Sequence, residues 1–98
     1  MTITLSRHRF SGPHAVRGAV PCSGPGLYAF LDGREILYIG QSAAVRYRVG
    51  PGHHKWCAFL RRARDPRIGF LCMATQSAAA RTGLEKVLIR IHRPALNG

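Results

Sequence analysis

Glu85 is the acidic side chain that is best placed to take part in chemistry. The sequence has only four carboxylates, and three of them, Asp32, Glu35 and Asp65, fall where turns are expected. Glu85 lies within a long regular segment, where it flanks the apolar stripe of a helix and points toward the edge of the core. Such a position suits a metal ligand at the floor of a cleft. The alternative is an i,i+4 ion pair with Arg81, worth only a few tenths of a kcal/mol.

Two tyrosines and two arginines are the next candidates. Tyr28 and Tyr38 fall in neighbouring predicted strands, where they could also be ordinary aromatic residues on one sheet face. Arg46 and Arg48 are separated by one residue in a short segment. If that segment is helical, a step of two residues turns by about 200°, so both side chains cannot reach one phosphate group. Arginine is suited to that task because its planar fork matches phosphate oxygens.

His53 and His54 follow a turn with the sequence Gly50–Pro51–Gly52. Histidine changes its charge near neutral pH and can assist proton transfer. Both residues could equally begin the helix that follows, whose apolar face includes Trp56. The sequence leaves open which of the two histidines is catalytic, if either.

A β-hairpin over residues 26–41 is expected to position the tyrosines. Residues 27–31 and 36–39 are apolar runs of strand length, and Asp32–Gly33 lies between them. An Asp-Gly pair between apolar runs is a strong hairpin signal, because the tight turn needs a positive φ that glycine adopts without steric penalty.

The elements after the hairpin are expected in the order helix, helix, strand, helix. Ser42 could cap a short helix over residues 43–49, and a second helix is predicted from His53 or His54 to Arg64. Residues 68–74 form an apolar run of strand length.

Ser77 opens the longest helix, which Pro94 ends. Its predicted apolar stripe is Ala80, Leu84, Val87, Leu88 and Ile91.

The predicted fold class is α+β, with a three-stranded antiparallel sheet flanked by helices in the order ββ-α-α-β-α. Residues 1–19 are expected to be an N-terminal extension with little structure, apart from a possible short strand at residues 2–5. Residues 20–98 are expected to form the domain. At 98 residues, with 46% apolar and 19% charged residues, the chain suits one folded domain.

Five separated positions resemble the motifs of the GIY-YIG nuclease family. Gly26–Leu27–Tyr28 and Tyr38–Ile39–Gly40 resemble the paired signature that names the family, with Leu27 in place of the usual Ile. Arg48 lies ten residues after Tyr38, where the family carries its invariant arginine. Glu85 falls in the helix that carries the metal-binding glutamate, and residues 94–97 resemble the closing Pro-x-Leu-Asn. The resemblance spans roughly Pro21 to Asn97, and five sites in the right order rarely occur by chance.

This resemblance implies an endonuclease that hydrolyses phosphodiester bonds with one divalent metal ion, Mg²⁺ or Mn²⁺. Glu85 would bind the metal through one carboxylate, with waters and substrate phosphate as the other ligands. Tyr28 would be the general base, aided by a neighbour such as Tyr38 or a histidine, because a tyrosine pKa of about 10 is too high without help. Arg48 would hold the scissile phosphate. Asn97 would hydrogen-bond near Glu85 and fix its geometry.

One position departs from the family pattern. The family usually carries a His or Tyr four residues after the arginine, but Gly52 stands there and His53 and His54 follow it. Either the loop through Gly50 has one extra residue, or the role of this position is altered.

The charge of the chain indicates its class of partner. Fifteen Lys and Arg residues against four Asp and Glu residues give a formal net charge of +11. Nucleic acid is the commonest partner of such a domain, because basic side chains release the counterions that condense on phosphates. A ribosomal or chromatin-like binder would show the same excess. The candidate contacts to nucleic acid, with DNA as the expected partner, are Gln41, Arg46, Lys55, Arg61, Arg62, Lys86 and Arg90.

The apolar runs and the cysteines of the sequence bear on the cellular compartment of the protein. No apolar run approaches the roughly 20 residues of a membrane span, and residues 1–10 lack the apolar core of a signal peptide, so a cytoplasmic protein is expected. Cys22, Cys57 and Cys72 are odd in number and widely spaced, which is typical of free thiols in a reducing compartment. A zinc site built from Cys57, Cys72 and a histidine is a weaker alternative.

Two classes of function remain open at this stage. The first is the metal-dependent endonuclease, which the full set of family-type residues favours. The second is a basic nucleic-acid-binding protein of the same fold with weak or no catalysis, which the altered spacing before His53 favours. DNA or RNA specificity and the oligomeric state are not determined by the sequence.

Overall fold

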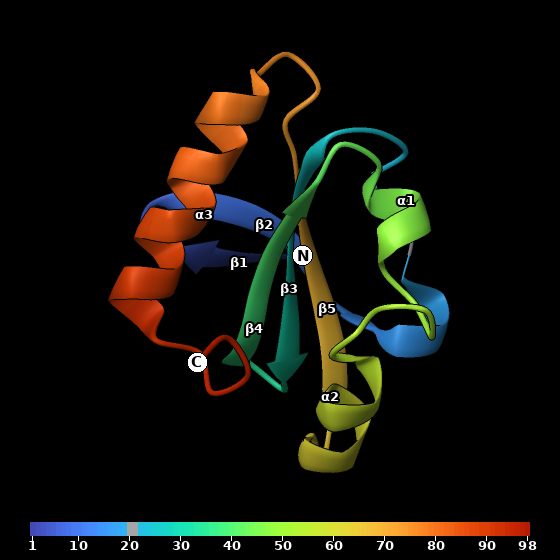
Figure 1. Ribbon diagram of the computed structural model, residues 1–98. Helices are drawn as coiled ribbons and strands as arrows, with labels where there is room; N and C mark the ends of the chain where they lie inside the picture. Colours follow the sequence, from blue (N-terminus) through green and yellow to red (C-terminus); the bar gives the residue numbers. More distant parts are fainter. Residues whose placement is uncertain (20–21) are drawn as a thin grey trace.

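The computed structural model describes residues 1–19 and 22–98 as a single antiparallel sheet with helices on both of its faces (Figure 1). Pro21, where the family resemblance begins, and the proposed domain boundary at residue 20 lie outside the described residues. In chain order the elements are β1 (Thr2–Leu5), β2 (His8–Ala15), the 3-10 turn η1 (Val16–Gly18), β3 (Gly26–Asp32), β4 (Glu35–Ser42), α1 (Val45–Arg48), α2 (Trp56–Arg62), β5 (Pro66–Cys72) and α3 (Ala78–His92).

The predicted hairpin is confirmed as β3 and β4. These strands pair from Gly26 opposite Ser42 to Asp32 opposite Glu35, and Gly33 in the turn has a φ of +60°. On its other side β3 pairs with β5, so β3 lies inside the sheet and β4 lies at its edge. The Asp-Gly turn and the two flanking apolar runs were therefore sufficient to predict this hairpin.

The prediction of three strands is wrong, because the sheet has five in the order β1-β2-β5-β3-β4. Residues 1–19, expected to have little structure, form the hairpin β1–β2, and β2 pairs with β5. Without β2, the long strand β5 would present an unpaired edge. Ile3, Leu5 and Phe10 are buried in the core beside Leu88 of α3. This pairing with a distant strand orders a segment whose basic and polar residues gave a weak local signal.

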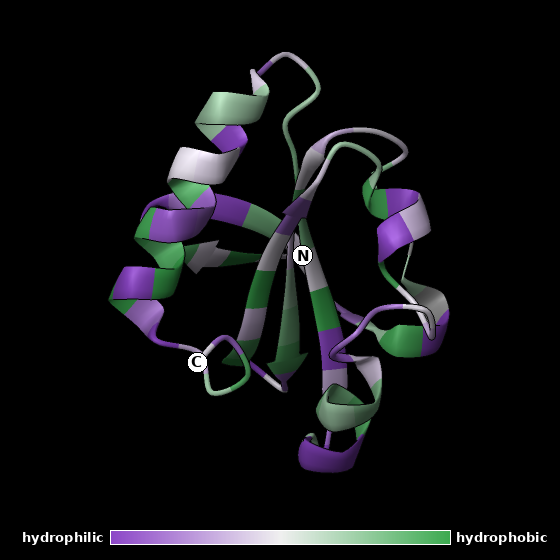
Figure 2. Cartoon of the chain, viewed as in Figure 1, coloured by the Kyte–Doolittle hydropathy of each residue, from purple (hydrophilic) through white to green (hydrophobic). Residues whose placement is uncertain are grey.

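The two sheet faces bury alternate residues of β3, as the twofold period of a strand requires. Tyr28 and Phe30 face α1 and α2, where they pack with Val45 and Phe59. Leu27, Ala29 and Leu31 face α3 and pack with Leu88. Figure 2 shows the apolar residues concentrated along the strands, while the last turn of α2 is hydrophilic.

The helices α1 and α2 are shorter than predicted, whereas α3 has its predicted extent but is rotated relative to its predicted stripe. Ser77 is confirmed as the N-cap of α3, because its Oγ accepts a hydrogen bond of 3.1 Å from the backbone N–H of Ala80. Val87 and Ile91, assigned to the buried stripe, are 44% and 56% exposed, whereas Arg81 is only 8% exposed. No helix in residues 1–19 and 22–98 is long and apolar enough to cross a membrane.

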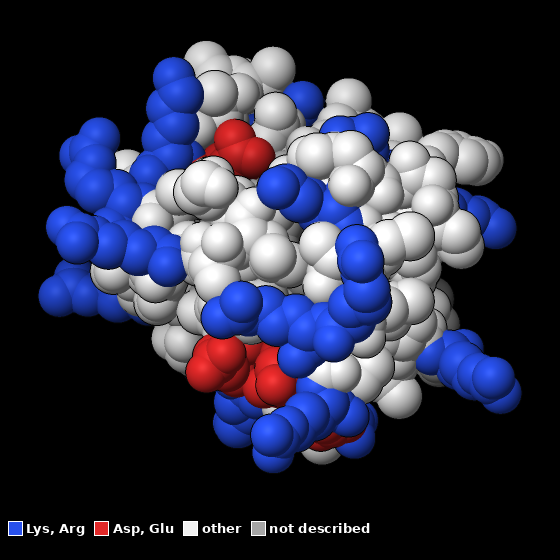
Figure 3. All heavy atoms as spheres, turned by 60° about the horizontal axis from the view of Figure 1, so that its bottom comes forward, with Lys and Arg blue, Asp and Glu red and all other residues white. Residues whose placement is uncertain are grey.

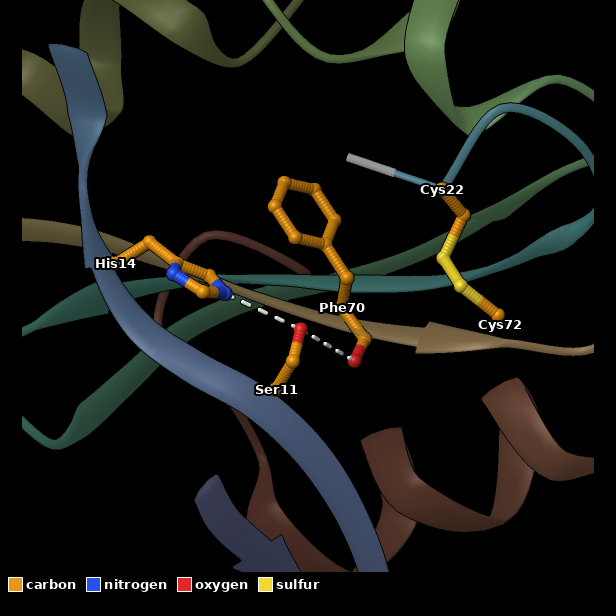
Figure 4. Close-up of a disulfide and its surroundings, with 5 residues drawn as sticks. All are labelled: Ser11, His14, Cys22, Phe70 and Cys72. Atoms are coloured by element: carbon orange, nitrogen blue, oxygen red, sulfur yellow. Dashed lines mark hydrogen bonds between the residues drawn. A yellow bond between two sulfur atoms is a disulfide. The ribbon is translucent and has the colours of Figure 1, made fainter. Parts of the chain in front are cut away.

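Cys22 and Cys72 form a disulfide, so the prediction of free thiols is wrong for these two residues (Figure 4). Their Cα atoms lie 5.7 Å apart, although the residues are separated by 50 positions in the sequence. The pairing of Gly26 with Cys72 brings the end of β5 to the segment before β3. Cys57 is free and exposed. Cysteine usage therefore no longer supports the expected reducing compartment.

Candidate active site

Most of the predicted site residues meet around the edge strand β4. Tyr38 lies on β4, Tyr28 on the adjacent β3, Arg48 on α1, and His53 and His54 in the loop before α2. The ring centroids of Tyr28 and Tyr38 are 6.2 Å apart, and the two histidine rings stack at 4.6 Å. Glu85 lies on α3, which covers the sheet face opposite to α1 and α2 (Figure 1), and its carboxylate interacts with the backbone of Gln41 on β4.

The hydroxyl of Tyr28 is held by His53. Tyr28 is 1% exposed, and its Oη lies 2.7 Å from Nε2 of His53, which is 3% exposed. Nδ1 of His53 accepts a hydrogen bond of 3.0 Å from the backbone N–H of Lys55. A neutral imidazole has one protonated nitrogen, so the proton lies on Nε2 and is donated to Tyr28. Burial, with the nearby charges of Arg48 and His54, lowers the pKa of His53 to about 4, which keeps the ring neutral.

Gly40 makes room for the Tyr28 ring. The two residues face each other across β3 and β4. A Cβ atom at Gly40 would lie 2.5 Å from both Cζ and Oη of Tyr28, closer than packed atoms can approach. The glycine that ends the Tyr-Ile-Gly motif is therefore required by the buried tyrosine of the other motif.

We expect Gly40→Ala to displace the Tyr28 ring and lower the free energy of unfolding by about 1–3 kcal/mol, the usual cost of overpacking a core. Thermal or denaturant unfolding would measure the change. Gly83→Ala is the matched control, because no atom lies within 4 Å of a Cβ at that helical position. Alanine there should be neutral or stabilising. Equal destabilisation by the two variants would contradict the steric explanation.

Both tyrosines have a raised pKa. Burial, followed by the proximity of Tyr38, raises the pKa of Tyr28 to about 12, while the Arg48 guanidinium acts to lower it. Burial and then the Glu85 carboxylate raise the pKa of Tyr38, and Arg48 again opposes the shift. Both hydroxyls are therefore protonated at neutral pH in the free protein. A role for Tyr28 as a base requires added positive charge near its oxygen.

Arg48 faces this cluster. Its Nη2 donates a hydrogen bond of 3.2 Å to Nδ1 of His54, and its charge acts on both tyrosine hydroxyls. Arg46 and Arg48 are both exposed on α1, but no hydrogen bond or ion pair within residues 1–19 and 22–98 involves the Arg46 side chain. The two arginines thus have different surroundings, as a two-residue step along a helix requires.

Glu85 is half-buried on α3 and lies beside β4. Burial raises the pKa of its carboxyl group, whereas a hydrogen bond from the backbone N–H of Gln41 lowers it. The alternative ion pair with Arg81 is wrong, because Nε of Arg81 instead donates to Oε1 of Gln41 at 3.1 Å. Within the described part of the chain, the one ion pair joins Arg67 to Asp65. The Glu85 carboxylate is therefore free of a cationic partner there.

The donor set fits a hard cation that keeps most of its waters. No group of three or more His, Cys, Asp or Glu residues in the described ranges could hold a metal ion. A single carboxylate, half-buried and without an ion pair, matches the way Mg²⁺ is bound through one or two carboxylates plus waters and phosphate. The zinc alternative fails, because Cys72 is in the disulfide.

Asn97 fixes the edge of β4, which corrects its predicted hydrogen bond near Glu85. Its Oδ1 accepts from the backbone N–H of Ile39 at 2.8 Å, and its Nδ2 donates to the Ile39 carbonyl at 2.9 Å. The backbone N–H of Leu96 donates to the carbonyl of Leu37 at 2.8 Å. The closing motif thus covers the outer edge of β4 and holds the strand that carries Tyr38.

The other residues that were predicted to contact nucleic acid are spread over the surface. Arg61 and Arg62 are exposed at the end of α2, Lys86 and Arg90 are exposed on α3, and Lys55 is half-buried. Figure 3 shows basic side chains projecting on several sides of one face, with small acidic patches near its top and at its bottom. Arg81 was not among the predicted site residues, although its position four residues before Glu85 on one helix face was a usable signal.

Comparisons with known proteins agree with this geometry. No family model matches the sequence. Over 73 residues, or 74% of the chain, it is 34% identical to UvrABC system protein C of Thermus thermophilus, and the match spans 12% of that protein's length.

The structure is similar to crystal structures of the GIY-YIG N-terminal endonuclease domain of UvrC from Thermotoga maritima. A tyrosine-to-phenylalanine mutant, bound to its catalytic divalent cation, superposes with a TM-score of 0.58 at 22% identity, covering 74% of this chain and 81% of that one. An asparagine-to-alanine mutant, also bound to its cation, has a TM-score of 0.53 at 22% identity and the same coverage. With the spaced motifs that converge on β4, these similarities show that the chain belongs to the GIY-YIG nuclease superfamily.

Proposed function

We propose that this chain is a metal-dependent endonuclease that hydrolyses phosphodiester bonds in nucleic acid, with DNA as the expected substrate. The observation that carries the proposal is the convergence of the Tyr28–His53 pair, Arg48 and Glu85 around β4. The similar UvrC domains are described as endonuclease domains bound to a catalytic divalent cation. A one-metal mechanism with Mg²⁺ or Mn²⁺ suits a site with a single carboxylate ligand.

Each residue has a defined task in this mechanism. Glu85 would hold the metal ion, which when bound neutralises charge that develops on the phosphoryl oxygens. Arg48 would hold two oxygens of the scissile phosphate, and His54 would restrain the guanidinium through their hydrogen bond. Tyr38 would border the phosphate site, and Asn97 would act indirectly by fixing β4.

Tyr28 would accept the proton of the attacking water at Oη. Its deprotonated form is stabilised by the Nε2–H donor of His53 and by the charge of Arg48. His53 suits this task because a neutral ring with its proton on Nε2 keeps donating as the tyrosine loses its proton. The histidine in the altered loop would thus occupy the role that the family gives to a His or Tyr.

We expect the activity to rise with pH. A base whose pKa is raised to about 12 is almost wholly protonated at neutral pH, and its active fraction grows about tenfold per pH unit below the pKa. A bound metal ion would lower the pKa of Tyr28 and shorten the rise, whereas the negative charge of a bound phosphate would oppose that shift. Measurement of kcat/KM from weakly acidic to alkaline pH, at saturating metal ion, tests this expectation. A flat profile, or an equal rise in Tyr28→Phe, would exclude Tyr28 as the base.

The test of the whole proposal is plasmid nicking with and without Mg²⁺, followed by a panel of duplex, branched and single-stranded DNA and RNA. Cleavage should require the metal ion and disappear in Glu85→Gln. The alternative, a basic protein that binds nucleic acid without cleaving it, predicts bound but intact substrate. The proposed contacts to the phosphate backbone, which add affinity without sequence preference, are Gln41, Arg46, Lys55, Arg61, Arg62, Lys86 and Arg90.

A further inference from the structure

Arg81 is a buried cation that neither the fold nor the mechanism above explains. It is 8% exposed and lies on α3, one helical turn before Glu85. Burial of a guanidinium group is costly unless the charge is paired or hydrogen-bonded. In residues 1–19 and 22–98, no carboxylate forms an ion pair with Arg81. Arg81 is thus a buried positive charge that no ion pair among the described residues neutralises, one helical turn from the proposed metal ligand.

Gln41 holds this guanidinium in place. Oε1 of Gln41 accepts a hydrogen bond of 3.1 Å from Nε of Arg81, while the backbone N–H of the same residue acts on the Glu85 carboxylate and lowers its pKa. Gln41 follows Gly40 on β4, so one residue connects Arg81 and Glu85 to the edge of the site. This arrangement restricts the side chain before any ligand binds, which reduces the entropy cost of binding.

The outer end of the Arg81 guanidinium is available to a ligand. No hydrogen bond to Nη1 or Nη2 is present among the described residues, and no fully buried side-chain nitrogen or oxygen there lacks a partner. The two amino groups must therefore reach solvent. With Nε occupied by Gln41, they present a planar pair of donors, a geometry that matches two phosphate oxygens.

We propose that Arg81, oriented by Gln41, binds the backbone phosphate adjacent to the scissile phosphate. Residues four apart on a helix have Cβ atoms about 6 Å apart, so Arg81 lies within reach of the next phosphate of a strand held at Glu85. This inference rests on the proposed function, because it assumes that nucleic acid is the ligand. In this inference Gln41 orients Arg81, whereas the sequence predicted only that Gln41 contacts nucleic acid directly.

The decisive measurement is the salt dependence of DNA binding without divalent metal ion, so that cleavage does not interfere. Each phosphate contact to a short DNA duplex contributes about 0.9 to the slope of log K against log salt. Arg81→Met should lower the slope by about that amount and weaken binding about tenfold at low salt. Arg34→Met is the matched control, because Arg34 is exposed in the β3–β4 turn, at the other end of β4 from Gln41. It should leave the slope unchanged.

Two further variants separate binding from a structural role. Arg81→Lys keeps the charge and should restore most of the slope. Gln41→Met keeps Arg81 but removes its acceptor, and it should weaken binding about threefold, corresponding to the loss of one hydrogen bond. In cleavage assays Arg81→Met should raise KM more than it lowers kcat, as expected of a contact made equally in the ground and transition states.

The outcomes distinguish this inference from the function on which it rests. If the wild type binds and cleaves DNA but Arg81→Met keeps its slope, with only a lower melting temperature, Arg81 is structural and the inference is overturned. If Arg81→Met does not fold, the salt slope of Gln41→Met decides. Gln41 is uncharged and releases no counterion itself, so a lower slope reports loss of the Arg81 contact and supports the inference, whereas an unchanged slope overturns it. If the wild type does not bind nucleic acid, the proposed function fails together with the inference.

Discussion

Glu85→Gln is expected to abolish cleavage while binding to nucleic acid persists. The amide has nearly the same shape as the carboxylate but lacks the charge that would hold the metal ion, and loss of a metal ion worth several kcal/mol to the transition state lowers the rate by about 10³-fold or more. Binding should persist because the basic surface, and not this carboxylate, supplies the affinity. Rates of plasmid nicking in Mg²⁺ and Kd values measured without metal ion would show the two effects separately.

Glu35→Gln is the matched control for this experiment. Glu35 undergoes the same chemical change, but it is exposed at the start of β4, in the turn remote from the site. Its variant should cleave at the wild-type rate. Full activity in Glu85→Gln would contradict the one-metal mechanism, whatever the control shows.

Arg48→Ala is expected to remove most turnover with little change in binding, whereas Arg46→Ala should stay active at saturating substrate. Loss of a positioned donor to the transition state costs about 10²–10³ in rate. Both arginines are exposed on the same short helix, but it is Arg48 that acts on both tyrosine hydroxyls and bonds to His54. Loss of one peripheral phosphate contact should weaken binding only modestly.

Single-turnover rates and Kd values for the two alanine variants test this difference. The two variants remove the same charge from positions separated by one residue, so each is a control for the other. An exchange of the two phenotypes would mean that Arg46 holds the scissile phosphate. If Arg46→Ala and Arg48→Ala both lowered the rate only slightly, neither arginine would take part in catalysis.

Local sequence patterns were sufficient for the hairpin, for the N-cap of α3 and for the set of residues that meet at β4. Asp32–Gly33 and the flanking apolar runs act within a few residues, and so does the Ser77 hydroxyl that accepts from Ala80. The motif spacing placed Tyr28, Tyr38 and Arg48 in one candidate site, and the structure brings them together. Their catalytic roles remain predictions that the variants above would test.

Other features were decided only when distant segments met. The strand character of β2 depends on its pairing with β5, and the disulfide depends on the register that brings Cys72 to Cys22. The selection of His53 over His54 as the partner of Tyr28 depends on how the loop before α2 folds over the sheet. Turn chemistry and hydrophobic period act along neighbouring residues, whereas strand pairing, burial and hydrogen-bond partners depend on what the rest of the chain places alongside. For this reason the sequence could only nominate candidate site residues, and the tertiary structure determined that Asn97 braces β4 and that Arg81 is buried beside Gln41.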